Sequence, residues 1–226
     1  MLAYGKNVLL MMNPKEIKKV YLSKSKNDAE IKNFLKDNKI HFVVTSNDVL
    51  NKMVKGNHQG VVIEREEFKY FELKDIQDEE FLLILDHLED PHNFGAIIRT
   101  AEAAGIKTII IPKDRSVSVN DTVIKTSVGT TSNVKIVKVT NIAETIKKLQ
   151  KEGYFVYGTS MNGKDCRDVD FSGKKVLIIG NEGKGISKIV EEKCDEIISI
   201  PMKGEVNSLN ASVAAGILIF KMGGLS

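Results

Sequence analysis

The sequence predicts an α/β protein in which a parallel-sheet domain follows a smaller α/β unit. Apolar runs rich in Ile and Val recur through residues 81–226 and alternate with helical stretches. This alternation is typical of a doubly wound parallel sheet whose strands are buried on both faces. A shorter alternation of the same kind occupies residues 1–66. The polar, acidic segment 67–80 between them has no clear period, and we expect it to be a linker.

The pattern of apolar residues in the first 66 positions predicts a small unit of three strands and three helices. An apolar run at 8–12 stands directly before Asn13 and Pro14, which should end a helix there. A second helix is expected over 28–38, where apolar residues stand at helical spacing. Ser46 can cap a third helix. The strands are expected at 18–23, 41–45 and 60–64.

The second unit, residues 81–226, carries six apolar runs of strand length. They lie at 81–86, 107–112, 133–139, 154–160, 174–180 and 195–201. Helices are expected between or after them, at 93–104, 141–152, 187–193 and towards the C-terminus, from Ser208 to Met222.

The charge is distributed unevenly along the chain. The formal net charge is only +3, but residues 1–66 hold 12 Lys and Arg against 7 Asp and Glu. Residues 67–80 hold 2 against 6, and residues 81–226 hold 19 against 17. A basic unit beside a nearly neutral one favours docking to a phosphate backbone. Lysine-rich surfaces are also a common means of keeping a protein soluble.

Other features argue against a membrane-spanning, a secreted and a metal-binding protein. No apolar run approaches the roughly 20 residues that span a membrane, and the N-terminal residues lack the pattern of a signal peptide. The cysteines, Cys166 and Cys194, lie far apart and outside any metal-ligand spacing. We therefore expect no metal site and a reducing, cytoplasmic location.

Three loops follow the carboxyl ends of predicted strands, where open α/β sheets bind ligands. The first is at 86–105, where Pro91 and Asn93 should open a helix. Arg99 stands six residues after Asn93, just under two turns, so we expect both to face roughly the same side. A lone arginine on such a helix usually extends into water, but at a strand end its planar guanidinium can bind a phosphate.

The second loop, at 177–187, is rich in glycine. Gly180, Gly183 and Gly185 permit a tight backbone path between a strand and a helix, as in loops that bind phosphates or nucleotides. The spacing matches neither the dinucleotide fingerprint nor the P-loop, and a plain turn would also suit it. Glu182 has little local reason to stand between glycines, so we expect it to make a polar contact.

The third loop opens the apolar C-terminal helix. Asn207, Ser208, Asn210 and Ser212 gather there. Asn207 or Ser208 can serve as the N-cap. Helix capping accounts for only one of these four polar residues, so the other three need another explanation.

Together the segments at 90–105, 177–187 and 200–217 closely resemble the SpoU family of ribose 2′-O-methyltransferases, within the SPOUT superfamily. The resemblance covers the second unit, 81–226. Residues 4–12 and 56–64 also resemble the small substrate-binding domain that precedes the catalytic domain in the ribosomal RNA branch of that family.

This resemblance implies a trefoil-knotted catalytic domain that acts as a homodimer. The segment around 180–220 would pass through a loop and form a pocket for S-adenosylmethionine, with no metal. The implied cofactor contacts are Thr159, Gly180, Ile200 and Leu209. The residues that match the family's functional polar positions are Asn93, Arg99, Glu182, Ser208 and Asn210.

The activity implied is methyl transfer from S-adenosylmethionine to a ribose 2′-hydroxyl of RNA, with a guanosine of 23S ribosomal RNA as the expected target. The same chemistry on tRNA is an alternative, and so is a non-catalytic protein that assists ribosome assembly. In the expected mechanism Arg99 binds a substrate phosphate, because an arginine seldom gives up its proton. Glu182 would be a conventional base if it were free, and His92 ranks second.

Overall fold

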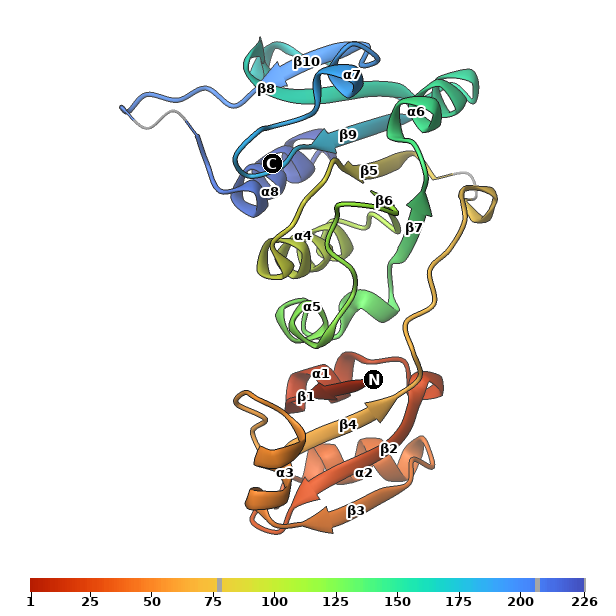
Figure 1. The fold of residues 1–226 in the computed structure, drawn as a ribbon, viewed down its shortest axis with the longest axis vertical. Coiled ribbons are helices and arrows are strands. Elements are labelled where there is room, and N and C mark those ends of the chain that lie inside the picture. The colour runs from red at the N-terminus through yellow and green to blue at the C-terminus, as the bar shows by residue number, and fades with distance from the viewer. Residues whose placement is uncertain (77–78, 206–207, 226) are drawn as a thin grey trace. The chain divides into compact units, whose positions relative to one another are not determined.

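The computed structural model describes residues 1–76, 79–205 and 208–225, and it divides into two compact units. The first unit comprises residues 1–69 together with 119–133. The second comprises residues 70–118 and 134–226. Figure 1 shows the elements of both.

The first unit is a four-stranded sheet with helices on it. Its sheet has the order β1-β4-β2-β3, in which β2 and β3 are parallel and the other neighbours antiparallel. The strands are β1 (Leu2–Tyr4), β2 (Ile17–Ser23), β3 (Phe42–Thr45) and β4 (Val61–Arg65). The helices are α1 (Lys6–Met11), α2 (Ala29–Asp37), α3 (Asn47–Met53) and α5 (Asp121–Thr126).

Local signals in the sequence account for these helices. The Asp28 side chain accepts hydrogen bonds from the backbone N–H groups of Glu30 and Ile31 and so caps α2. Ser46 caps α3 in the same way through the N–H of Val49, which confirms that prediction. The first helix ends one residue before Met12, ahead of the Asn-Pro pair, as predicted.

The second unit is a six-stranded sheet in which all neighbouring strands are parallel, in the order β10-β8-β9-β5-β6-β7. The strands are β5 (Phe81–Leu85), β6 (Thr108–Pro112), β7 (Lys135–Val139), β8 (Phe155–Asp165), β9 (Lys175–Ile179) and β10 (Glu196–Ser199). The helices are α4 (Pro91–Ala103), α6 (Ile142–Lys151), α7 (Lys188–Glu191) and α8 (Ala211–Met222). The predicted α/β class is confirmed, and the knot stays a prediction.

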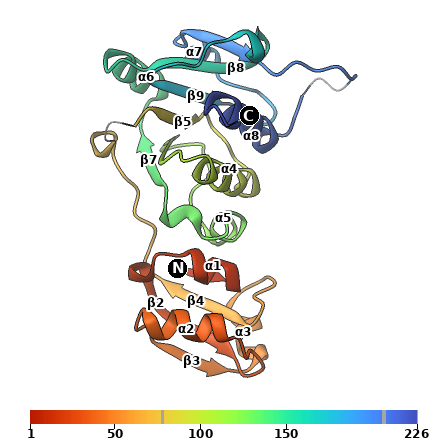
Figure 2. The same ribbon diagram turned by 180° about the vertical axis from the view of Figure 1, so that it is seen from behind.

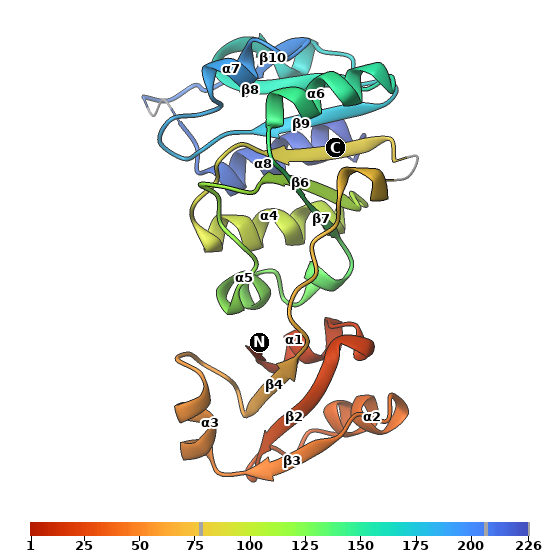
Figure 3. The ribbon, with the colours of Figure 1, turned by 45° about the vertical axis from the view of Figure 1, so that its right-hand side comes forward.

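Alternating residues of these strands fill two layers of core. Leu82, Ile84 and Ile178 pack in one cluster with residues of α6 and α7. On the sheet's other side α4 and α8 pack against each other, and α8 contacts β9. Figure 2 shows α4 beside α8, and Figure 3 shows α6 on the opposite side of the sheet from them. Burial on both faces explains why these strands are continuous apolar runs.

The division between the units differs from the expected one in two places. Residues 70–80 belong to the second unit: Phe71 forms backbone hydrogen bonds with Ile136 and Lys138, beside β7. The segment 119–133, expected in the second unit, belongs to the first. A carboxylate oxygen of Glu16 anchors it, because this oxygen accepts from the Arg65 guanidinium at 2.5 Å and from the Ser132 hydroxyl at 2.9 Å.

Three elements differ from the predicted ones. Strand β1 is only three residues long, too short for a periodic signal. Helix α5 has one and a half turns and was not predicted either. Strand β8 continues to Asp165 because β10 pairs with it twice, at Gly158 and again at Lys164 across an irregularity.

In the part of the chain that the structure describes, no helix has the length and apolar character of a membrane span.

Candidate functional site

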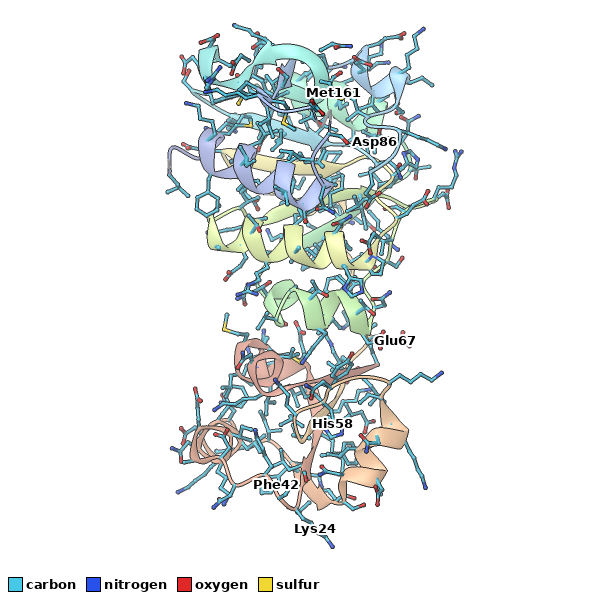
Figure 4. The ribbon with its side chains drawn as sticks, turned by 90° about the vertical axis from the view of Figure 1, so that its left-hand side faces the viewer. Lys24, Phe42, His58, Glu67, Asp86 and Met161 are labelled. Carbon is cyan, nitrogen blue, oxygen red and sulfur yellow. The ribbon has the colours of Figure 1, made fainter. Side chains whose placement is uncertain are left out.

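The loops singled out in the sequence meet at one edge of the second sheet. All six strands are parallel, so their carboxyl ends lie at this edge together, where such sheets bind ligands. Asp86 follows β5, the glycine-rich segment follows β9, and the segment from Ile200 follows β10. Asp86 and Met161 are labelled at this edge in Figure 4.

A cleft of about 920 Å³ opens at this edge. Its volume lies in the range of pockets that hold cofactors and other small molecules. Apolar side chains line part of it, including Ile198 and Leu218. Six of the nine candidate residues also line it, namely Thr159, Gly180, Glu182, Ile200, Ser208 and Leu209.

The buried Asn93 side chain joins the three loops. Its amide nitrogen donates to a carboxylate oxygen of Glu182 at 3.0 Å, and its amide oxygen accepts from the Asn210 side chain at 2.9 Å. Asn93 is only 6% exposed, whereas Glu182 and Asn210 are exposed, so each bond is shielded from water only on its Asn93 side. The first, second and third loops are thereby linked by one continuous chain of hydrogen bonds. The contact expected for Glu182 is present.

Asn210 also caps the C-terminal helix. Its side-chain oxygen accepts from the backbone N–H groups of Ser212 and Val213 at 2.9 and 3.4 Å. The prediction that Ser208 is the cap is therefore wrong, because α8 begins at Ala211, three residues further on. Ser208 is exposed and lines the cleft instead. Asn207 lies outside the described residues.

Arg99 does not share a side of α4 with Asn93. Its side chain is exposed, whereas Asn93 is buried. Six residues at about 100° each rotate by roughly 600°, which leaves about 120° between the two side chains. Among the described residues Arg99 forms no hydrogen bond or ion pair and does not line the cleft. The guanidinium is thus available to a ligand outside the cleft.

The glycine-rich loop is a tight turn that closes on itself. Asn181 and Gly185 exchange two backbone hydrogen bonds of 3.0 and 2.9 Å. A Cβ at Gly180 would overlap the backbone of Gly185 and Ile186. The close approach therefore requires glycine at position 180, and it brings backbone groups of the loop to the cleft wall. Thr159 faces the same cleft, and its hydroxyl donates to the Ile178 carbonyl at 2.9 Å.

Asp86 is a site residue that the sequence reasoning missed. It is 1% exposed, and its carboxylate accepts from the Ser187 backbone N–H at 2.7 Å and pairs with the His87 ring at 2.6 Å. The His87 carbonyl accepts from the Asn181 side chain at 3.0 Å. These two residues therefore hold both ends of the glycine-rich loop. The signal was a carboxylate directly after a run of buried apolar residues, since such a group needs partners.

The remaining candidates have structural explanations. The backbone N–H of His92 donates to the Asp90 side chain, which caps α4, so this position belongs to the helix start. Burial raises the pKa of the Cys194 thiol to about 12, which keeps it protonated and unreactive. Within residues 1–76, 79–205 and 208–225 no group of three His, Cys, Asp or Glu is arranged as a metal site.

Two family models, both of RNA methyltransferases, together match most of the chain. Residues 80–220 match the model of the SpoU rRNA methylase family, and residues 2–71 match the model described as RNA 2′-O ribose methyltransferase substrate binding. A Bacillus subtilis protein named as a TrmH family tRNA/rRNA methyltransferase is 45% identical over 181 residues, which is 76% of this chain and 73% of that protein.

Two solved structures are similar to the whole chain. An AdoMet-bound rRNA methyltransferase from Sinorhizobium meliloti has a TM-score of 0.80 at 25% identity and covers 98% of this chain and 85% of its own. The SpoU methyltransferase AviRb from Streptomyces viridochromogenes, in complex with AdoMet, has a TM-score of 0.84 at 22% identity and shares the fold. The alignment covers 99% of this chain and 89% of AviRb.

We predict that Gly180→Ala abolishes binding of S-adenosylmethionine. The added methyl group would displace the backbone of Gly185 and Ile186 and so deform the cleft wall. Calorimetry should show the cofactor affinity falling by at least about 100-fold, equivalent to roughly 2.7 kcal/mol. Gly183→Ala is the matched control, because its nearest contact would be an ordinary 3.7 Å. Equal cofactor affinities for the two variants would contradict this account.

Proposed function

Because the chain belongs to the SpoU rRNA methylase family, we propose that it transfers a methyl group from S-adenosylmethionine to a ribose 2′-hydroxyl of RNA, with a guanosine of 23S ribosomal RNA as the target. The hydrogen-bond chain from Glu182, which lines the cleft, through Asn93 to Asn210 is the observation that carries this proposal. The match of residues 2–71 to a ribose methyltransferase substrate-binding model supports the ribose as acceptor.

The cleft suits S-adenosylmethionine. We assign the cofactor contacts to Thr159, Gly180, Ile200 and Leu209, all of which line it. When bound, this cofactor supplies a methyl group already activated by a positively charged sulfur. The chain therefore has to orient the hydroxyl and remove its proton.

Glu182, Asn93 and Asn210 act in this proposal as one positioning unit. The Asn93 N–H donor uses one oxygen of the Glu182 carboxylate and fixes its direction. Asn210 holds Asn93 in turn and is itself fixed as the cap of α8. Ser208, exposed on the cleft wall, contributes a hydroxyl that can orient the substrate.

Arg99 binds the phosphate of the nucleotide to be methylated. An arginine keeps its proton at ordinary pH, because its guanidinium is a very weak acid. Its role is therefore to fix the phosphate and the adjacent hydroxyl through a planar, two-pronged contact, so that a phosphate oxygen can help to take the proton. Arg99 does not line the cleft, so the substrate phosphate would lie outside the cofactor pocket.

The proposed target can be tested by mapping 2′-O-methyl groups in RNA from cells with and without the protein. We expect one guanosine of 23S ribosomal RNA to lose its methyl group when the protein is absent. The relatives carry names that include both tRNA and rRNA, so the tRNA of the same cells should be mapped in parallel. A site lost from tRNA alone would redirect the proposal to tRNA, and the loss of no site would reject it.

Arg99→Ala is expected to reduce methyl transfer by roughly 100-fold or more, or ~2.7 kcal/mol, while cofactor affinity changes little. Arg99→Lys should fail too, because an ammonium lacks the planar geometry. Single-turnover transfer to ribosomal RNA and calorimetry measure the two effects. Lys151→Ala on α6 removes an exposed charge on the other side of the sheet and should be neutral. An inactive Glu182→Gln with an active Arg99→Ala would make Glu182 the base instead.

We propose further that the protein is a homodimer that assembles through α8. Val213, Ile217 and Phe220 form an exposed apolar stripe on this helix, with exposed fractions of 50%, 43% and 36%. Their spacing places them on one face of the helix, and a twofold dimer would bury that face on both copies. Arg99 lies on α4, the helix that packs along α8, so it would be near this interface.

A reducing, cytoplasmic location stays a prediction, which the free Cys166 and Cys194 support.

Ile217→Asp should convert the dimer to a monomer, because two carboxylates would face each other across the apolar interface. Light scattering at micromolar concentration measures the mass. Ile189→Asp, on α7, is the matched control: Ile189 is 67% exposed and lies outside the stripe, so this variant should remain dimeric. A monomeric unmodified protein would contradict the assembly itself.

A further inference from the structure

The loop at residues 56–60 of the first unit is held rigidly by a buried histidine. His58 is 8% exposed, and its Nδ1 accepts from the backbone N–H of Gly60 at 2.9 Å. Its Nε2 therefore carries the proton and donates to the Asn51 side chain at 2.9 Å. Both ring nitrogens are satisfied within the protein, so His58 is an anchor for the loop. Figure 4 labels it within the first unit.

The two neighbours of His58 are exposed to solvent. Gln59 has a φ of 53°, a left-handed conformation that a residue other than glycine adopts at a cost of about 1–2 kcal/mol. The Asn57 side chain accepts from the backbone N–H of Gln59 at 3.2 Å and helps to hold it there. No described residue forms a hydrogen bond with the Gln59 side-chain amide. Strained residues held in this way cluster at ligand sites.

A lysine amine lies next to this amide. Lys125 of α5 extends over Gly5, donates to the Asn57 carbonyl at 3.5 Å and lies 5.1 Å from the centre of the Tyr4 ring. The Gln59 side-chain oxygen reaches the same point above Gly5. Burial lowers the pKa of Lys125, and its amine forms no ion pair with any described residue. An ammonium that is partly desolvated and has spare donors favours an anion such as a phosphate.

A second lysine covers the other side of the loop. The stem of Lys26 lies beside Gly60, 3.4 Å from the point where a Cβ at position 60 would stand. Its amine is 3.8 Å from Asp28, which Lys6 already binds at 2.9 Å. Lys26 therefore keeps most of its capacity to bind a phosphate. Both lysines lie at one edge of the sheet: Lys26 follows the end of β2, and Lys125 lies beside Tyr4, where β1 ends.

We propose that the 56–60 loop, with Lys26 and Lys125 beside it, binds an unpaired segment of the RNA substrate. The two lysines bind phosphates, and the Gln59 amide reads a base edge through its donor and acceptor. An unpaired segment is favoured, because base edges in the deep major groove of an RNA helix are out of reach of side chains and those in the shallow minor groove are read mainly by shape. This assignment rests on the proposed function only for the identity of the RNA.

The test measures the affinity of the full chain for unmodified 23S ribosomal RNA made by transcription, over a range of salt concentrations. Lys125→Ala should weaken binding by roughly fivefold and lower the slope of log affinity against log salt by about one. Gln59→Ala should weaken binding by a similar factor and leave the slope unchanged, because the amide is uncharged. Lys36→Ala is the matched control: it removes one charge near the far end of α2 and should change neither.

Two further measurements keep the result interpretable. Unchanged cofactor affinity and unfolding temperature show that the variants fold normally; if Gln59→Ala unfolds, Gln59→Glu keeps the size of the side chain and should also weaken RNA binding. Variants of Gln59 and Lys125 that bind RNA like Lys36→Ala would overturn the proposal, as would an acidic peptide that binds with the same dependence on Gln59. If the unmodified protein bound RNA in the predicted way but methylated none, the proposed function would fall and the docking site would stand.

Discussion

Two hydrogen bonds of one buried amide connect the three loops at the carboxyl edge of the second sheet. Asn93 donates to Glu182 and accepts from Asn210, and an asparagine is suited to this because its amide has both a donor and an acceptor. An aspartate there would offer Glu182 no donor and would add a like charge. A hydrogen bond to a charged group contributes about 1.5–3 kcal/mol, and the exposure of Glu182 places this bond at the low end of that range. Three chain segments that are distant in sequence are placed by these contacts.

The wall of the cleft depends on a second set of contacts. Asp86 and His87 hold the exit and the entrance of the glycine-rich loop, and Gly180 lets the loop fold back against itself. The part of the cleft wall that this loop forms is thus shaped by backbone geometry. A site of this kind is organised before its ligand arrives, which reduces the ordering cost of binding.

Much of this arrangement could be predicted from the sequence. The apolar runs are long because both faces of the second sheet are covered, so the strands from β5 to β10 were found with small errors at their ends, except that the continuation of β8 to Asp165 was missed. Six residues that line the cleft were found from the motifs. The side of α4 that Arg99 occupies and the cap at Asn210 were not, because each depends on the helix phase or on where the helix starts. The place of α5 was not found, because short helices owe their place to tertiary packing. The trefoil knot stays a prediction from the family resemblance, because a knot is a property of the chain path and no local pattern encodes it.

Residues 119–133 belong to the first unit, although in sequence they lie between two parts of the second unit. This arrangement has a consequence for the evolution of the gene. Related enzymes can exchange a domain by recombination only where the exchanged stretch of DNA encodes everything that the domain packs against. A crossover after codon 69 would deliver the first four strands without α5 and would leave Glu16 facing a foreign partner in place of Ser132. Recombination at that point therefore succeeds only when both parent genes encode compatible residues at 119–133, some fifty codons downstream. Codons 1–69 and codons 119–133 are therefore expected to vary together among descendants.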